Sequence, residues 1–532
     1  MIMNRKEFLK NLATGAVLAP TMLNGFNVRA SNTSPFANML DEDTVADTDK
    51  VLVLIRLAGG NDGLNTVVPL ENYAQYKTAR QALAIVENKV VKPTNVTKWG
   101  FHPSLPAFKK LYDEGKMKVV QSVGYPDQDF SHFRSSDIWQ TGADANEVLN
   151  TGWVGRYLKY EYPNYPNGFP NTTMPDPLAV EISYSLSLSL QGPVTGMGVT
   201  IANVKDFYKL TQGIQAAAPN TPAGEQLKYV RLVAYLSNKY NESLKNAYEK
   251  VKNTNISMPI NNELAEKLGI VAQLIAGGLK TRIYVVTLDE FDTHKIQADS
   301  SDSSKGFHSD LLKKLNDAVS SFMQNLKTLG VQDRVLGMTF SEFGRRIIAN
   351  GSGGTDHGAA APMFIFGNKV LGGTLGTNPV LPDKPQWDSN VVMQYDFRSV
   401  YASILKDWFC VPNKDLQEIF FKNYQALSIV NPSACIPTAT HESNQEAGEK
   451  LINIYPNPFT EITNIGFKSS GGHTMIQIFN SAGKIVAVPV NRHFEEGNQV
   501  IAWNSENLPT GVYYCRLQNG SISQVQNMLK VR

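Results

Sequence analysis

Acidic, histidine and serine side chains stand at the ends of five apolar runs in this chain. They are Asp62 in AGGNDGLN, Ser131 and His132 in DFSHFRSS, Asp292 and His294 in DEFDTH, Glu342 in FSEFG, and His357 in TDHG. Carboxylate oxygens and imidazole nitrogens together suit zinc or manganese, and a site dominated by oxygen suits calcium. The sequence therefore predicts a site for a divalent metal, either zinc, manganese or calcium.

Each of these residues also has a purely structural interpretation. Asp62 lies in a Gly-Asn-Asp-Gly turn, where aspartate is a common turn former. Asp292 and His294 can cap the segment that follows them, and Glu342 can form a surface ion pair with Arg345. Independent turns would not be expected to place metal ligands at every strand end, so we favour one shared site.

The elements that position these residues are short apolar runs alternating with helical patterns. Val51 to Leu57 is a β-branched run that glycines stop, and similar runs are KVVQSVGYP, RIYVVTLDEFD, RVLGMTFSEFG and PMFIFG. Between them, LLKKLNDAVSSFMQNLKTLG has leucines at helical spacing before a glycine. This alternation predicts a doubly wound, mostly parallel α/β sheet, in which ligands bind outside the carboxyl ends of the strands.

Changes in composition divide the 532 residues into segments. The predicted segments are a signal peptide at 1–30, a linker at 31–50, an α/β domain at 51–432 with an insertion at about 151–281, a linker at 433–450, and a small all-β sandwich at 451–532.

The composition limits the possible partners. The chain is 42% hydrophobic and carries a net charge of +2, without a basic block that would bind a phosphate backbone, so we expect no nucleic-acid partner. Three cysteines without CxxC spacing exclude a zinc ribbon and a disulfide scaffold, although one pair can form if the protein is exported.

The N-terminus has the layout of an export signal. Arg5 and Lys6 precede a short, weakly apolar stretch that is too short to span a membrane. The order of residues resembles a twin-arginine signal, but Lys6 stands where the second arginine belongs. A Sec signal and a basic helix that stays on the protein are therefore alternative interpretations. No other stretch reaches the length of a transmembrane span, so no span is predicted.

The C-terminal segment resembles the type A sorting domain of the type IX secretion system found in Bacteroidetes. The motifs that carry the resemblance are NIYPNPF, IFNSAGKIV, LPTGVYYCRL and the basic ending KVR. The resemblance implies contact with that secretion machinery, export through the periplasm, and a final location that is secreted or on the outer-membrane cell surface. The alternative is an ordinary carbohydrate-binding or adhesive sandwich.

The α/β segment resembles the bacterial family called domain of unknown function 1501. Six motifs occur in the order of that family: LIRLAGGNDGLNTVVP, FHPSL, VGYPDQDFSHFRSSDIWQTG, TLDEFDTH, MTFSEFGRR and GTDHGAAAPMFIFG. They cover the chain from about Val51 to Cys410. The family is similar to the alkaline phosphatase and sulfatase superfamily, whose members use a bimetallic site on a doubly wound sheet.

The superfamily resemblance implies a ligand set for one or two metal ions. Asp62 matches the first-strand aspartate, Asp292 and His294 match an Asp and His pair that is usually spaced further apart, and His357 matches the last histidine. Glu342 and the phenylalanine after it stand where an Asp-His pair is expected, so one imidazole ligand is missing. The second ion is therefore less well supported than the first.

The position of the nucleophile departs from the superfamily pattern. An ungapped match places His132 where a serine, threonine or cysteine is expected, and a shift of one residue would place Ser131 there. A hydroxyl at a helix N-terminus beside a cation is activated by both. His132 can instead bind metal or form a phosphohistidine. Arg134 can bind an oxyanion or pair with Asp129 or Asp137.

These features predict a secreted, metal-dependent hydrolase of phosphate or sulfate esters, acting on a small-molecule or glycan ester. The alternative is a non-catalytic surface or adhesion protein that keeps the fold, with or without one metal. In a third possibility Glu342 is a general base. The leading hypothesis requires that the side chains of Asp62, Asp292, His294 and His357 converge on one point. If Glu342 points away from that point, the site can hold at most one metal ion.

Overall fold

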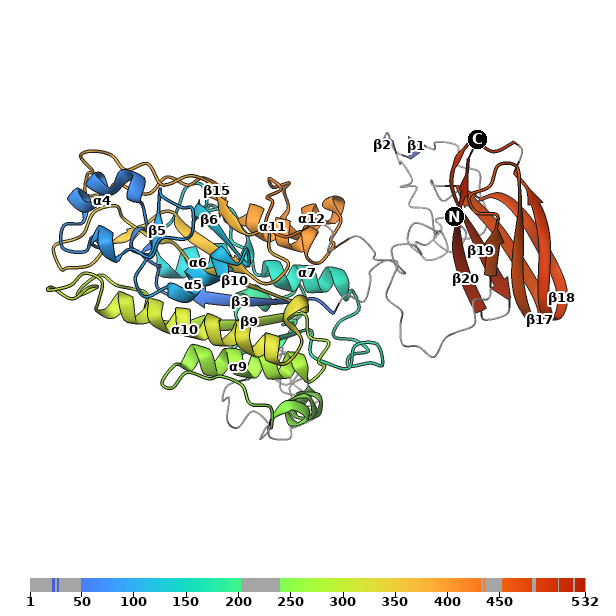
Figure 1. Cartoon of the computed structure of the whole chain (residues 1–532), viewed down its shortest axis with the longest axis horizontal. Coiled ribbons are helices and arrows are strands. Elements are labelled where there is room, and N and C mark those ends of the chain that lie inside the picture. Colours follow the sequence, from blue (N-terminus) through green and yellow to red (C-terminus); the bar gives the residue numbers. More distant parts are fainter. Residues whose placement is uncertain are drawn as a thin grey trace. The chain divides into compact units, whose positions relative to one another are not determined.

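The computed structural model describes residues 49–201, 240–431, 435, 452–480, 485–505, 507–519 and 522–531, and a strand pair formed by β1 (Met22–Leu23) and β2 (Phe26–Asn27). The chain forms two compact units (Figure 1). One comprises Asp47–Pro437, and the other comprises Met1–Ala46 with Thr438–Arg532. The signal-peptide prediction for 1–30 falls outside the described residues, apart from that strand pair.

A nine-stranded sheet forms the centre of the larger unit. Eight strands follow the order β14-β6-β13-β10-β3-β9-β7-β8, and β15 also pairs with β6. Their bounds are β3 Val51–Leu57, β6 Met117–Gly124, β7 Ala179–Glu181, β8 Val199–Thr200, β9 Ile283–Leu288, β10 Val335–Phe340, β13 Ala361–Phe366, β14 Gly373–Leu375 and β15 Tyr395–Asp396. Only β13 runs antiparallel to its neighbours.

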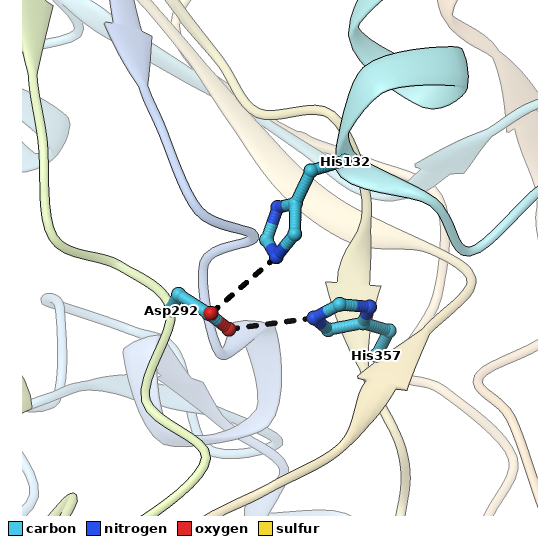
Figure 2. Close-up of side chains that lie close together, drawn as sticks. All are labelled: His132, Asp292 and His357. Carbon is cyan, nitrogen blue, oxygen red and sulfur yellow. Dashed lines mark hydrogen bonds and ion pairs between the residues drawn. The ribbon is translucent and has the colours of Figure 1, made fainter.

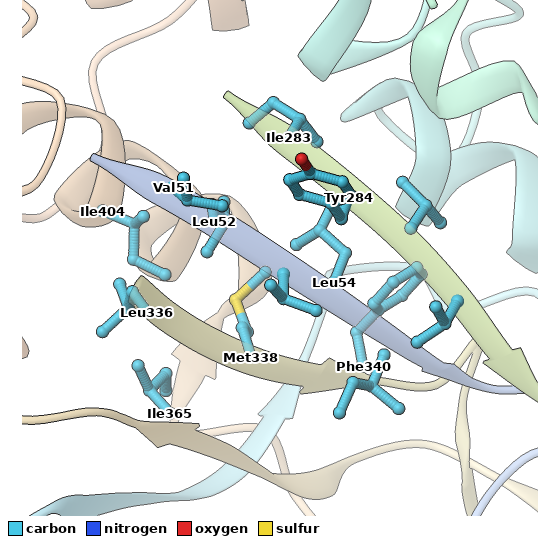
Figure 3. Packing of buried hydrophobic residues seen from close by; sticks show 14 of the residues in the cluster. Val51, Leu52, Leu54, Ile283, Tyr284, Leu336, Met338, Phe340, Ile365 and Ile404 are labelled. Atoms are coloured by element: carbon cyan, nitrogen blue, oxygen red, sulfur yellow. The ribbon is translucent and has the colours of Figure 1, made fainter. Parts of the chain in front are cut away.

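The prediction of a mostly parallel α/β sheet is confirmed. The five apolar runs identified in the sequence are β3, β6, β9, β10 and β13. Strand β3 lies between β9 and β10, where six of its seven residues are buried. Figure 3 shows the resulting core, in which Leu52 and Leu54 pack beside Met338 and Ile404. Such continuous burial on both faces explains why the runs are apolar throughout and do not alternate.

Helices cover both faces of this sheet. Figure 1 shows α9 (Glu263–Ala276) and α10 (Phe307–Thr328) on one side, and α11 (Phe397–Asp407) and α12 (Asn413–Phe420) on the other. Other helices are α4 Tyr73–Ala79, α5 Pro106–Asp113, α6 His132–Thr141 and α7 Trp153–Glu161, and residues 240–251 are also helical. The apolar stripe predicted between residues 311 and 330 is the buried face of α10.

Part of the segment predicted as an insertion belongs to the sheet. Strands β7 and β8 extend the edge beyond β9, and α9 packs against β9 and α10. The stretch 202–239 lies outside the described residues. At least this edge of segment 151–281 is therefore continuous with the α/β core.

The smaller unit contains one antiparallel sheet of five strands. They are β16 Ile452–Tyr455, β17 Ile462–Asn480, β18 Ile485–Asn504, β19 Gly511–Asn519 and β20 Ile522–Lys530. Hydrogen bonds between Phe459, which lies between β16 and β17, and both Leu529 and Val531 at the end of β20 bring the two sides of the sheet together, so the sheet nearly closes. Strands β17 and β18 are long and continuous, because Ser469 and Ser470 stay paired with β18.

One disulfide joins Cys410 and Cys435, whose Cα atoms are 5.3 Å apart, and Cys515 is free and buried. None of the described helices is both long and apolar enough to cross a membrane.

Candidate metal centre

Three side chains from distant parts of the chain converge at the carboxyl ends of the central strands (Figure 2). His132 is the first residue of α6, Asp292 follows β9, and His357 begins β12 (His357–Gly358). Each offers a ligand atom, and these atoms lie within 4.8 Å of one another. His357 reaches this edge because β13, which follows it, runs antiparallel, so its beginning lies where the neighbouring strands end.

Asp292 is the centre of the cluster, and a third imidazole approaches it. The Nε2 atom of His132 is 3.4 Å from Oδ2 of Asp292. The Nε2 atoms of His294 and His357 are each 3.3 Å from Oδ1. Of the five predicted metal ligands, the structure thus brings Asp292, His294 and His357 together, and it adds His132, which the sequence placed at the nucleophile position.

The outer nitrogen of each imidazole has an acceptor. Nδ1 of His132 is 3.1 Å from Oε1 of Glu342, and Nδ1 of His294 is 3.1 Å from Oδ1 of Asp356. Nδ1 of His357 is 2.7 Å from the carbonyl oxygen of Phe130. A neutral imidazole that donates from Nδ1 has its lone pair on Nε2. Each ring can therefore adopt the tautomer that binds a metal through Nε2, and the outer partners are of the kind found in metal centres.

The inner nitrogens are too close for two rings that both carry their only proton on Nδ1. Nε2 of His294 lies 2.8 Å from Nε2 of His357, and both face Oδ1 of Asp292. Unprotonated nitrogens and a carboxylate oxygen repel one another at such distances. A proton on one Nε2, which makes an N–H···N hydrogen bond between the two rings, or a metal ion removes this repulsion, and the donor set fits a cation.

Arg345 supplies a fixed positive charge behind Asp292. Its side chain is 0% exposed, and it donates to Oδ1 of Asp292 at 2.8 Å and to the carbonyl oxygens of Gly60 and Thr355. Burial alone would raise the pKa of Asp292, but the hydrogen bond and charge of Arg345 outweigh it, so that pKa lies below its usual value. Asp292 is thus held as a carboxylate.

Glu342 acts on the cluster through His132. Its Oε1 accepts from the backbone N–H of Gly59 at 2.7 Å and faces His132, while its buried Oε2 has no partner among the described residues. The hydrogen bond that His132 donates to Glu342 raises the pKa of His132. Gly59 is required for this approach: its φ is +119°, and a Cβ there would lie 2.3 Å from the backbone nitrogen of Asp292. Glu342, predicted as a metal ligand, therefore points to the outer side of an imidazole.

Asp62 differs most from its prediction as a metal ligand. It is completely buried, and its Oδ2 accepts from Arg80 and from Gln297, both at 2.5 Å. Burial would raise the pKa of Asp62, but the charge of Arg80 and the hydrogen bonds outweigh it. Asp62 therefore forms a buried ion pair with Arg80 and does not join the cluster at Asp292. The Arg80 guanidinium already compensates the charge of Asp62.

The other two predicted catalytic residues lie at the start of α6. Ser131 is the exposed N-cap residue, and its side chain makes no capping hydrogen bond. Arg134 donates to the carbonyl oxygens of Asp144 and Ala145 at 3.1 and 2.9 Å, and to that of Glu147. The structure thus directs Arg134 to the backbone of the 144–147 loop and away from Asp292.

Sequence reasoning singled out Glu342, as a metal ligand or general base, but it did not identify the outer partners of His294 and His357. Asp356 precedes His357 directly, so its position in the TDHG motif was the available signal. The carbonyl oxygen of Phe130 has no sequence signal, because every residue carries a backbone carbonyl.

Two segments match known protein families. Residues 238–405 match the family described as "Protein of unknown function (DUF1501)", and residues 453–531 match the "Secretion system C-terminal sorting domain". Both resemblances noted in the sequence are thereby confirmed. A sorting domain of this type implies secretion or export to the cell surface. Among curated proteins, none matches this sequence significantly.

Similar solved structures include phosphatases and a sulfatase. A mutant of alkaline phosphatase PafA is 10% identical with a TM-score of 0.25, covering 56% of this chain and 63% of its own. PsFucS1 sulfatase from Pseudoalteromonas sp. is 10% identical with a TM-score of 0.32, covering 90% and 88%. PorZ, a surface component of the type IX secretion system of Porphyromonas gingivalis, is 16% identical with a TM-score of 0.13, covering 15% and 11%. The chain therefore spans less than two thirds of the length of PafA and PorZ. At TM-scores this low, the roles of residues in these proteins are not assigned to residues of this chain.

Proposed function

We propose that this protein is a secreted, metal-dependent hydrolase of phosphate or sulfate esters. The observation that carries the proposal is the convergence of three imidazole Nε2 atoms on Asp292, each imidazole being oriented by a hydrogen-bond acceptor at Nδ1. Rings protonated only on Nδ1 would repel one another at this solvent-exposed edge of the sheet, and a bound metal ion would remove that repulsion.

The residues that would hold the ion are His132, Asp292, His294 and His357. Three nitrogen donors and one carboxylate favour zinc or manganese over calcium, which prefers oxygen ligands. A bound ion of this kind polarises the ester oxygen and lowers the pKa of water. One ion per chain is expected, because Arg345 occupies the inner side of Asp292 and Glu342 faces away.

The start of α6 supports an anionic substrate. Its N-cap residue Ser131 provides no side-chain hydrogen bond to the first-turn amides, and His132, the first helical residue, is part of the cluster. Backbone N–H groups and the helix dipole at such a terminus stabilise phosphate or sulfate oxygens. We therefore assign the ester's oxyanion to the space between the first turn of α6 and the cluster.

Two nucleophiles are compatible with this placement. The Ser131 hydroxyl is exposed beside His132, and water has free access because the side chains of Asp292 and His294 are 45% and 41% exposed. The rival function, a non-catalytic surface protein, is supported by the direction of Arg134, which leaves the cluster without that guanidinium.

Metal analysis and turnover test the proposal together. The purified chain is stripped with a chelator, reloaded separately with zinc, manganese and calcium, and assayed with 4-nitrophenyl phosphate and 4-nitrophenyl sulfate. We expect about one zinc or manganese ion per chain and turnover of one ester. Asp292→Asn should lose both, whereas Asp289→Asn, an exposed acid on the same loop, should retain both.

Binding of metal without turnover of either ester would favour the non-catalytic alternative. Loss of turnover in Ser131→Ala with retained metal would identify the serine as nucleophile, and full activity of that variant would assign the attack to water.

A further inference from the structure

Two highly exposed aromatic side chains are linked to the candidate metal centre, one by its place in the sequence and one by hydrogen bonds. Phe133, which is 87% exposed, directly follows His132 at the start of α6. Trp387, which is 70% exposed, is connected to His357 through Arg346. Tyr184 is the only other aromatic residue with comparable exposure among the described residues. Large apolar side chains in water usually mark a binding surface when they adjoin a polar site.

The Trp387 ring is held in place by Arg346. The Arg346 guanidinium lies 4.9 Å from the ring centroid and donates to the carbonyl oxygen of Trp387 at 2.9 Å. Its Nε donates to the carbonyl oxygen of His357 at 3.2 Å. A cation on one face of an exposed indole restricts its rotation and leaves the opposite face free. The ring is therefore oriented before any ligand arrives.

The cluster itself is open, which limits what can be bound. The exposed fractions of Asp292 and His294 show that a ligand reaches the centre from outside the protein. A small ester would bury little of its surface there, so affinity must come from contacts beyond the ester group. Phe133 near His132 and Trp387 near His357 supply such contacts on the same edge of the sheet.

We propose that Phe133 and Trp387 form a platform for the sugar rings of a polysaccharide that carries the phosphate or sulfate ester. This inference rests on the proposed function, because it assigns the substrate class of the same site. The C–H face of a pyranose ring packs flat on an aromatic ring, while its anionic substituents are free to face the cations of the site. The sorting segment at 453–531 implies secretion or export to the cell surface, where a polysaccharide would be accessible.

Exposed rings that adjoin polar and cationic groups suit a polymer better than a membrane. Insertion into lipid requires a contiguous apolar surface, whereas here Arg346 and the three imidazoles lie with the rings. A chain of sugars, in contrast, presents apolar ring faces and charged substituents in alternation. The pattern of the platform therefore matches a charged polysaccharide.

Binding of the full-length, metal-loaded chain to polysaccharides tests the platform. The probes are heparin, chondroitin sulfate, carrageenan and a phosphorylated mannan in native affinity gels, with uncharged dextran as the reference. We expect at least one charged polymer to retard the protein more than dextran does. Phe133→Ala and Trp387→Ala should each weaken that binding by about fivefold to tenfold, with the metal content unchanged. Tyr455→Ala, an exposed aromatic of the smaller unit, is the matched control and should not alter binding.

The outcomes separate this inference from the proposed hydrolase activity. Ring-dependent retention without turnover of any ester supports the platform and refutes the hydrolase. Turnover of a 4-nitrophenyl ester without retention by any polymer supports the hydrolase and refutes the platform. Equal retention of the parent chain and the Phe133→Ala/Trp387→Ala double variant also refutes it, because binding would then occur elsewhere.

Discussion

Removing the charge of Glu342 should weaken metal binding although Glu342 is not itself a ligand in this geometry. Its Oε1 lies 3.1 Å from Nδ1 of His132 and accepts from the N–H of Gly59 at 2.7 Å. The carboxylate fixes the tautomer of His132 and makes its Nε2 more basic. In Glu342→Gln the amide oxygen can still accept both hydrogen bonds, so the change removes charge and keeps shape.

The size of the effect follows from what each variant removes. Loss of an outer carboxylate partner typically lowers metal affinity by about 10 to 100-fold, which corresponds to about 1.4 to 2.7 kcal/mol. We expect Glu342→Gln near the lower limit, because the acceptor remains. Glu342→Ala should lie near the upper limit, and it also leaves the buried N–H of Gly59 without its acceptor, at a cost of about 1 to 3 kcal/mol in stability.

Competition with a chromogenic zinc chelator measures the dissociation constant, and thermal unfolding of the metal-free proteins measures stability separately. Glu290→Gln is the control, because Glu290 is an exposed acid two residues before Asp292. Its negative charge can influence metal binding only through general electrostatic attraction. Dissociation constants of both Glu342 variants within about twofold of the parent would refute the role of this carboxylate. Equal weakening in Glu290→Gln would attribute the effect to overall charge.

Two further predictions concern buried charges. Arg80→Met should lower the free energy of unfolding by about 3 to 5 kcal/mol in urea titrations, because it leaves the buried Asp62 carboxylate without its cation. Lys109→Met, which breaks an exposed pair with Asp113, should cost about 1 kcal/mol or less, and similar losses in both variants would contradict the buried role. Burial raises the pKa of Glu181 to about 7 from 4.5, so the folded state keeps a proton that the unfolded chain releases. Stability should therefore fall by up to about 3 kcal/mol as the pH rises from 4.5 to 7, and Glu181→Gln should remove that fall; identical pH profiles of both proteins would contradict it.

The elements of the α/β unit could be predicted from sequence because their signals are local. Continuous β-branched runs such as Val51–Leu57 are buried on both faces, and helical spacing marks the buried side of α10. Parallel strands bring their carboxyl ends to one edge, so Asp292 and His294 after β9 were expected there. His357 was also found, through the motif that precedes its strand.

The partner of each side chain was decided by tertiary packing. Asp62 and Asp292 have the same carboxylate and both follow a strand, yet Asp62 pairs with Arg80 while Asp292 faces three imidazoles. His132 stands at the position of a nucleophile in the sequence but turns its Nε2 toward Asp292. No local pattern distinguishes these outcomes.

The sequence by itself thus determined the strands, the edge at which polar residues gather, and the sorting segment. The tertiary structure decided which of those residues form a cation site and which form a buried ion pair. The reason is physical: periodicity records whether a residue is buried, and burial depends on the segment's own composition. The charge of a carboxylate, in contrast, is compensated by whichever distant donor the fold places within hydrogen-bond distance. Here those donors are Arg80, Gln297 and Arg345, which pack around the strand ends.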